Sequence, residues 1–117
     1  MKESVLKTKS YVFAIHIVKL SQLLISEKKE YVLSKQLLRS GTAIGALIRE
    51  AEFAQSKKDF VNKMSISLKE ANETQYWLDL LKDTNYMETK NHEFLMNQCK
   101  ELTAMLVSSI KTTKSRM

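Results

Sequence analysis

The stretch QLLRSGTAIGALIREA, residues 36–51, decides the fold class of this 117-residue chain. Apolar side chains recur in it every three or four residues, which is the spacing of one helix face. Both glycines of the protein, Gly41 and Gly45, lie one helical turn apart inside this pattern. Glycine in a helix interior costs roughly 0.5–1 kcal/mol relative to alanine. The pair therefore predicts that another helix packs here too closely for a β-carbon.

Three further segments show the same periodicity, with short polar stretches between them. The predicted helices span residues 4–26, a segment from Tyr31–Ser34 to Ala54, residues 57–83 and residues 88–112. Ser56 is the expected N-cap of the third helix, with Asp59 in its first turn. No segment alternates with period two, so no strand is predicted, and residues 111–117 are expected to fray.

Short connections make successive helices antiparallel neighbours. The sequence therefore predicts an all-α, antiparallel up-down-up-down four-helix bundle. Its length fits one domain covering residues 1–117.

This topology gives the charge an uneven distribution. The chain carries 19 basic and 13 acidic residues, a net charge of +6. The start of the first helix, the turn between the second and third, and the end of the fourth are expected to meet. A net charge of +6 gathers there, from Lys2, Lys7, Lys9, Lys57, Lys58, Lys111, Lys114 and Arg116 against Glu3 and Asp59. The candidate nucleic-acid-binding residues are Lys7, Lys9, Lys57 and Lys58, assisted by Lys111, Lys114 and Arg116.

The second and third helices should pair antiparallel about the turn at residues 54–57. Position i then faces roughly position 111 minus i, which puts Arg39 beside Glu70 and Glu73. These three residues form either a polar binding notch or an interhelix ion pair that sets the register. The ion pair is the favoured interpretation.

The sequence contains few of the motifs that indicate an enzyme or a metal site. Glu70 and Glu73 lack the Glu-x-x-His motifs of di-iron bundles, and no phosphate loop or nucleophile elbow occurs. His16 and His92 are expected at the surface or at helix ends, and Cys99 as an inert core residue. We therefore expect a protein that is not an enzyme and has no metal site and no cofactor.

Two groups of apolar residues have alternative interpretations. Tyr76 and Trp77 fill core or subunit-interface volume, or else stack RNA bases; packing is the favoured role. All four predicted helices have an apolar surface wider than one narrow stripe, as at Tyr11, Val12 and Ile15, which suggests that part of it is buried against other copies. The single cysteine, the lack of a signal-like start and the lack of a membrane-length apolar run favour a cytoplasmic location without membrane contact.

Two motifs resemble a known family. They are KQLLRSGTAIGALIREA at residues 35–51 and, after Phe60, KEANETQYWLDLL at residues 69–81. Both are similar to the four-helix-bundle proteins encoded in intervening sequences of bacterial 23S ribosomal RNA genes. The matching positions are Gln36, Leu37, Arg39, Ser40, Ile44, Ile48, Glu50, Ala51, Lys69, Glu70, Ala71, Glu73, Thr74, Tyr76, Trp77 and Leu78. The chain departs from the family at Leu47, where asparagine is common.

The resemblance implies a ring-like homopentamer. It also implies kinship with the basic accessory bundles of diversity-generating retroelements, which engage RNA and a reverse transcriptase. Together with the charge distribution, it favours a non-enzymatic, oligomeric RNA-binding bundle. The alternative is a scaffold that binds a protein partner without contacting nucleic acid.

Overall fold

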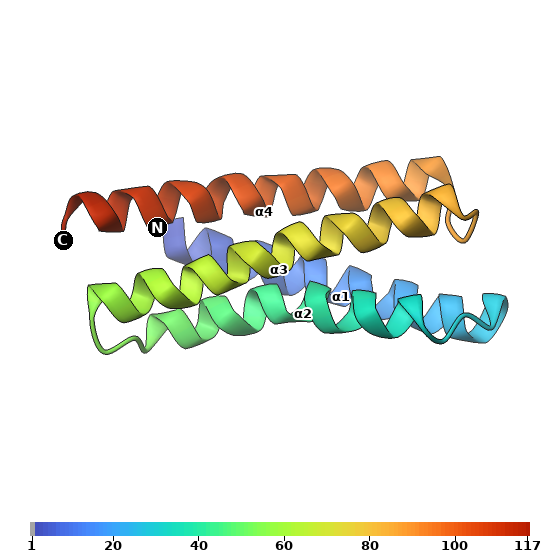
Figure 1. Ribbon diagram of the computed structural model, residues 1–117, viewed down its shortest axis with the longest axis horizontal. Coiled ribbons are helices and arrows are strands. Elements are labelled where there is room, and N and C mark those ends of the chain that lie inside the picture. The colour runs from blue at the N-terminus through green and yellow to red at the C-terminus, as the bar shows by residue number, and fades with distance from the viewer. Residues whose placement is uncertain (1) are drawn as a thin grey trace.

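The computed structural model describes residues 2–117, with side chains from Val5 onward, and it confirms the four-helix bundle. The helices are α1 (Lys2–Lys28), α2 (Leu33–Glu52), α3 (Lys57–Asp83) and α4 (Thr89–Ser115). They run up, down, up and down along a rod of 47 × 21 × 20 Å (Figure 1). Each helix packs on the helices before and after it, and α1 and α4 close the ring. Among the described residues, no helix is both long enough and apolar enough to span a membrane.

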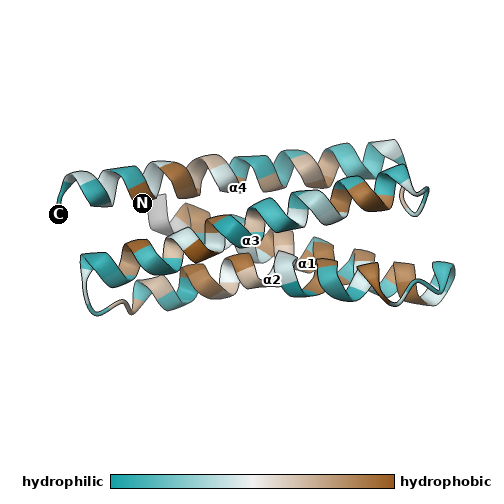
Figure 2. Cartoon of the chain, in the orientation of Figure 1, coloured by the Kyte–Doolittle hydropathy of each residue, from teal (hydrophilic) through white to brown (hydrophobic). Residues whose placement is uncertain are grey.

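The core follows the apolar stripes of the sequence. Phe13, Ile17, Ile44, Leu78 and Leu106 are among its fully buried side chains. Hydrophilic and hydrophobic stretches alternate along α2, α3 and α4, and several of the visible stretches of α1 are hydrophobic (Figure 2). On α1, Tyr11, Val12, Ile15, Val18 and Ile25 are exposed apolar side chains. This helix therefore has an apolar side that the bundle does not cover.

The contact between α1 and α2 explains both glycines. A β-carbon on Gly41 would lie 2.8 Å from Cγ2 of Ile17, and one on Gly45 would lie 3.1 Å from Oγ of Ser10. Both neighbours belong to α1. Small polar residues are buried between α2 and α3 as well, where the Ser67 hydroxyl donates to the Ile44 carbonyl at 2.9 Å.

Local interactions fix the helix ends. The Ser56 hydroxyl accepts the N–H of Asp59 at 3.0 Å, which is the expected cap of α3. The Glu30 carboxylate accepts three N–H groups at the start of α2, from Val32, Leu33 and Ser34. Helix α4 continues to Ser115, three residues beyond the predicted end. No proline or glycine stops it, and the basic side chains of its last turns favour a helix C-terminus.

The interface between α1 and α4 is the most open of the four. Two surface hollows of about 250 Å³ lie along it, one lined partly by Val12 and Leu102, the other partly by Leu23 and Phe94. His16 of α1 bridges the gap, with Nδ1 3.1 Å from Oε1 of Gln98.

Candidate nucleic-acid interface

The ends predicted to meet do meet. The beginning of α1, the α2–α3 turn and the end of α4 lie at one end of the rod (Figure 1). The Lys7 ammonium lies 2.8 Å from the Glu52 carboxylate and joins α1 to α2. The Lys57 ammonium donates to the Arg116 carbonyl at 3.0 Å and joins α3 to α4. All four helices therefore contribute to one polar surface, here called the basic end.

The expected charge of this end needs a correction. Lys7 pairs with Glu52, and Lys9 pairs with Glu101 of α4 at 3.1 Å. With these two acids included, eight basic and four acidic residues leave a net charge of +4 rather than +6. Glu52 is the last residue of α2 and Glu101 lies inside α4, and each reaches its lysine across a helix interface that a count along the chain does not show. Lys2 and Glu3, which the sequence also assigns to this end, have side chains outside the described residues.

Five cations remain at the basic end without an ion pair to any acid that the structure describes. They are Lys57, Lys58, Lys111, Lys114 and Arg116. Lys57 and Arg116 also line a surface hollow of about 280 Å³, together with Ser56, Phe60 and Thr113. Exposed cations on rigid helix ends attract phosphate without reading a base sequence. The α2–α3 turn and the end of α4 are therefore the strongest candidates for a phosphate-binding surface.

Sequence reasoning missed one residue at this end. Phe53 is the C-cap residue of α2, and 84% of its surface is exposed, the largest fraction among the large hydrophobic residues described. Its N–H bonds to the Glu50 carbonyl at 3.0 Å, which fixes the backbone of the turn. A signal was available, because Phe53 falls outside the apolar stripe formed by Ile44, Ile48 and Ala51.

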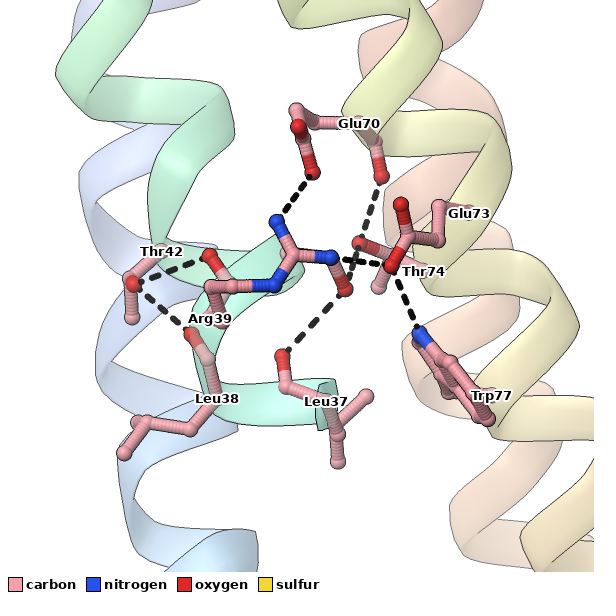
Figure 3. Close-up of polar contacts among 9 residues, drawn as sticks. Leu37, Leu38, Arg39, Thr42, Glu70, Glu73, Thr74 and Trp77 are labelled. Carbon is pink, nitrogen blue, oxygen red and sulfur yellow. Dashed lines mark hydrogen bonds and ion pairs between the residues drawn. The ribbon is translucent and has the colours of Figure 1, made fainter. Parts of the chain in front are cut away.

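The second candidate cluster surrounds Arg39, at mid-length between α2 and α3 (Figure 3). Arg39 Nη1 donates to Glu70 at 3.3 Å, and Nη2 donates to Glu73. The indole N–H of Trp77 donates to the same Glu73 carboxylate at 3.0 Å. Arg39 thus has two carboxylate partners. The cluster therefore has no free cation with which to bind a negatively charged ligand. This geometry supports the interhelix ion pair over the binding notch.

The aromatic pair beside this cluster is divided between core and surface. Trp77 packs against the core, whereas Tyr76 is exposed and meets the Trp77 ring edge-on, with centroids 5.0 Å apart. Because the neighbouring Glu73 carboxylate repels phosphate, the pair is a poor place for RNA to bind.

Cys99 and His92, the other side chains that could take part in chemistry, are buried and hydrogen-bonded within the bundle. Cys99 is buried, its thiol donates to the Ala71 carbonyl at 3.4 Å, and burial raises the pKa of this thiol from 9.0 to about 12. His92 lies in the first turn of α4, at a helix end as expected; it is buried, and its Nε2 lies 2.7 Å from Oδ1 of Asp79. Among the residues that the structure describes, no group of His, Cys, Asp and Glu could hold a metal ion.

Known proteins agree with this picture of the fold. No curated protein matches the chain. One solved structure, a protein of unknown function from the S23 ribosomal protein family of Bacteroides thetaiotaomicron, is 55% identical. It superposes with a TM-score of 0.94 over 95% of this chain and 99% of its own. The family model described as 23S rRNA-intervening sequence protein matches residues 2–108, and the chain therefore belongs to that family.

Proposed function

We propose that this protein is a non-enzymatic, oligomeric helical bundle that binds RNA through its basic end. The observation that carries the proposal is the set of five cations without ion pairs on the α2–α3 turn and the end of α4. The family description, which names ribosomal RNA, agrees in the kind of polymer involved. Lys7 and Lys9 contribute less than the five because each already has a carboxylate partner.

The binding mode follows from elementary electrostatics. Each lysine or arginine that neutralises a phosphate releases a condensed counterion, so affinity falls as salt rises. For single-stranded RNA the expected slope of log affinity against log salt is about −0.7 per phosphate neutralised. Five cations per subunit therefore predict a slope of about −3.5 for one subunit, and a steeper one where copies bind together.

The test is retention of structured RNA on filters across a salt series. The variant K58E/K111E/K114E reverses three charges at the basic end, while K28E/K29E/K90E reverses three at the opposite end as a matched control. We expect the first variant to lose binding at about 50 mM salt and the control to retain it. Absence of binding by the wild-type protein at that salt, or equal loss in both variants, contradicts the proposal.

The oligomeric part of the proposal depends on α1. Tyr11, Ile15, Val18 and Ile25 are exposed and follow one another at spacings of four, three and seven residues, as in a coiled-coil seam. A second copy that covers this seam would remove apolar surface from water. We infer an assembly of identical copies, a ring of five by the family resemblance. In a ring all subunits point the same way, so the basic ends form one positive rim.

The same apolar seam favours a second candidate function, an assembly scaffold for a different protein. In that case the basic end is only solvated. A pull-down from nuclease-treated lysate distinguishes the two functions. A partner protein retained without RNA, and released by a charged substitution in the seam, supports the scaffold.

A further inference from the structure

Phe53 is exposed to an extent that the fold of the free chain does not explain. Burying a phenylalanine side chain is normally favourable, yet 84% of this residue is exposed to water. Its backbone is held, since its own N–H and that of Ala54 bond to the last carbonyls of α2. The Ser56 cap fixes the next helix three residues later. The ring is therefore presented on a rigid turn.

The charges around this ring favour an anionic partner. Of the acids nearest along the chain, Glu50 and Glu52 are paired with Lys63 and Lys7, and the Asp59 carboxylate accepts the N–H of Gln55 at 3.2 Å. Lys57 and Lys58 follow the turn, and neither pairs with any acid that the structure describes. The Cα atoms of Phe53 and Lys58 are five residues apart and so lie within about 18 Å of each other. An open aromatic ring and two cations without ion pairs are thus carried by the same short turn and the first residues of α3.

Three of the four other exposed aromatic rings that the structure describes contact another ring or a guanidinium group. The Arg49 guanidinium lies 5.3 Å from the Tyr11 ring centroid. Tyr76 meets Trp77 edge-on, and Phe94 meets His16 with ring centroids 5.3 Å apart. Tyr31 is open, but it lies at the opposite end of the rod, next to the Glu30 carboxylate at the start of α2.

We infer that Phe53 is a stacking platform for an unpaired RNA base whose flanking phosphates contact Lys57 and Lys58. This inference rests on the proposed RNA binding and adds the kind of RNA, which is single-stranded rather than duplex. Aromatic side chains stack on any base, and cations beside them hold the backbone, which is how single strands are bound without sequence preference. In a duplex the bases are already stacked on one another and leave the ring no partner.

The experiment measures fluorescence anisotropy of a labelled 12-nucleotide single strand and of the same sequence as a blunt duplex. The proteins compared are wild type, F53A, F53W and the control Y31A, which removes an aromatic ring that is 58% exposed at the opposite end. We expect F53A to lose about 5- to 150-fold in affinity for the single strand. F53W and Y31A retain wild-type affinity, and duplex binding changes less than about twofold in all four.

Each contrary outcome has its own meaning. Wild-type protein that binds neither RNA overturns the proposed function and this inference together. Wild-type protein that binds RNA while F53A binds equally well overturns only the role of Phe53. An F53A variant that loses oligomeric mass instead of RNA affinity assigns the ring to a protein contact. Salt dependence of F53A should keep the wild-type slope, because the substitution removes no phosphate contact.

Discussion

Gly41 lies where α2 packs tightly against Ile17 of α1, and its missing β-carbon permits that contact. An alanine there would meet Ile17, whose branched side chain is fully buried and stiff at χ1. Overpacking a core costs typically 1–3 kcal/mol, and the gain in helix propensity offsets roughly 0.5–1 kcal/mol of it. We expect G41A to lose about 1–2 kcal/mol of unfolding free energy in urea titrations.

Gly45 supplies the control for that prediction. Its β-carbon would meet the Ser10 hydroxyl at 3.1 Å, a smaller conflict with a side chain that can rotate. G45A should remain within about 0.5 kcal/mol of wild type, because the gain in propensity balances the contact. A G41A protein as stable as G45A would mean that Ile17 and the α1–α2 interface can shift to accommodate the added β-carbon at little cost in unfolding free energy.

Cys99 gives the folded protein a defined response to alkaline pH. Burial raises the pKa of its thiol from 9.0 to about 12. Between these values the unfolded chain releases the proton while the folded protein keeps it, so stability falls as pH rises. The fall approaches 1.36 kcal/mol per pH unit. It is measured as the difference between wild type and C99A in urea midpoints at about pH 8 to about pH 11. If the urea midpoints of wild type and C99A changed equally with pH, the raised pKa of the Cys99 thiol would be contradicted.

Residue-scale prediction from the sequence succeeded where the chain's own geometry decided the outcome. Helical spacing and antiparallel register bring Arg39 to Glu70 and Glu73. Contacts between helices distant in sequence were missed. The pairing of Lys9 with Glu101 depends on how α1 lies against α4, which no local pattern encodes.

At the scale of elements, the pairing of α2 with α3 carries the polar cluster around Arg39. The Arg39 side chain is 53% exposed, so its two ion pairs are partly screened by solvent. R39L removes both pairs and leaves Glu70 and Glu73 without a cation partner. We expect a loss of about 1 kcal/mol, seen as a melting temperature lower by roughly 4 °C.

K63L is the matched substitution, since Lys63 also joins α3 to α2 but through the single carboxylate of Glu50. It should lower the melting temperature less than R39L does. Unchanged melting and unchanged oligomeric state in R39L would remove the role of Arg39 in setting the register.

Helix boundaries were predictable to within a few residues because capping residues and polar turns are recognisable in the sequence. Ser56 and Asp59 mark the start of α3 in the sequence as they do in the structure. The start of α2 was less clear. Its first N–H groups are held by Glu30, which reads in sequence as part of the charged stretch that ends the first helix.

At the scale of the whole molecule, the apolar seam of α1 predicts assembly. Ile15 in the seam and Ile66 on α3 are 39% and 38% exposed, so neither contributes much to the core. We expect I15E to shift the mass measured by light scattering towards the monomer, because it places a charge in the interface. I66E should leave the mass unchanged. A wild-type monomer, or an I15E protein of wild-type mass, would rule out this seam as the interface.

The alternation of helix directions has one more electrostatic consequence. The basic end contains the N-termini of α1 and α3 and the C-termini of α2 and α4. Backbone macrodipoles of opposite sense cancel there, so the peptide units add almost no net field. The electrostatic polarity of the rod therefore comes from its charged side chains, chiefly from the excess of lysine and arginine over acids at the basic end. Acetylation of a few of those lysines would erase it while every helix stayed in place.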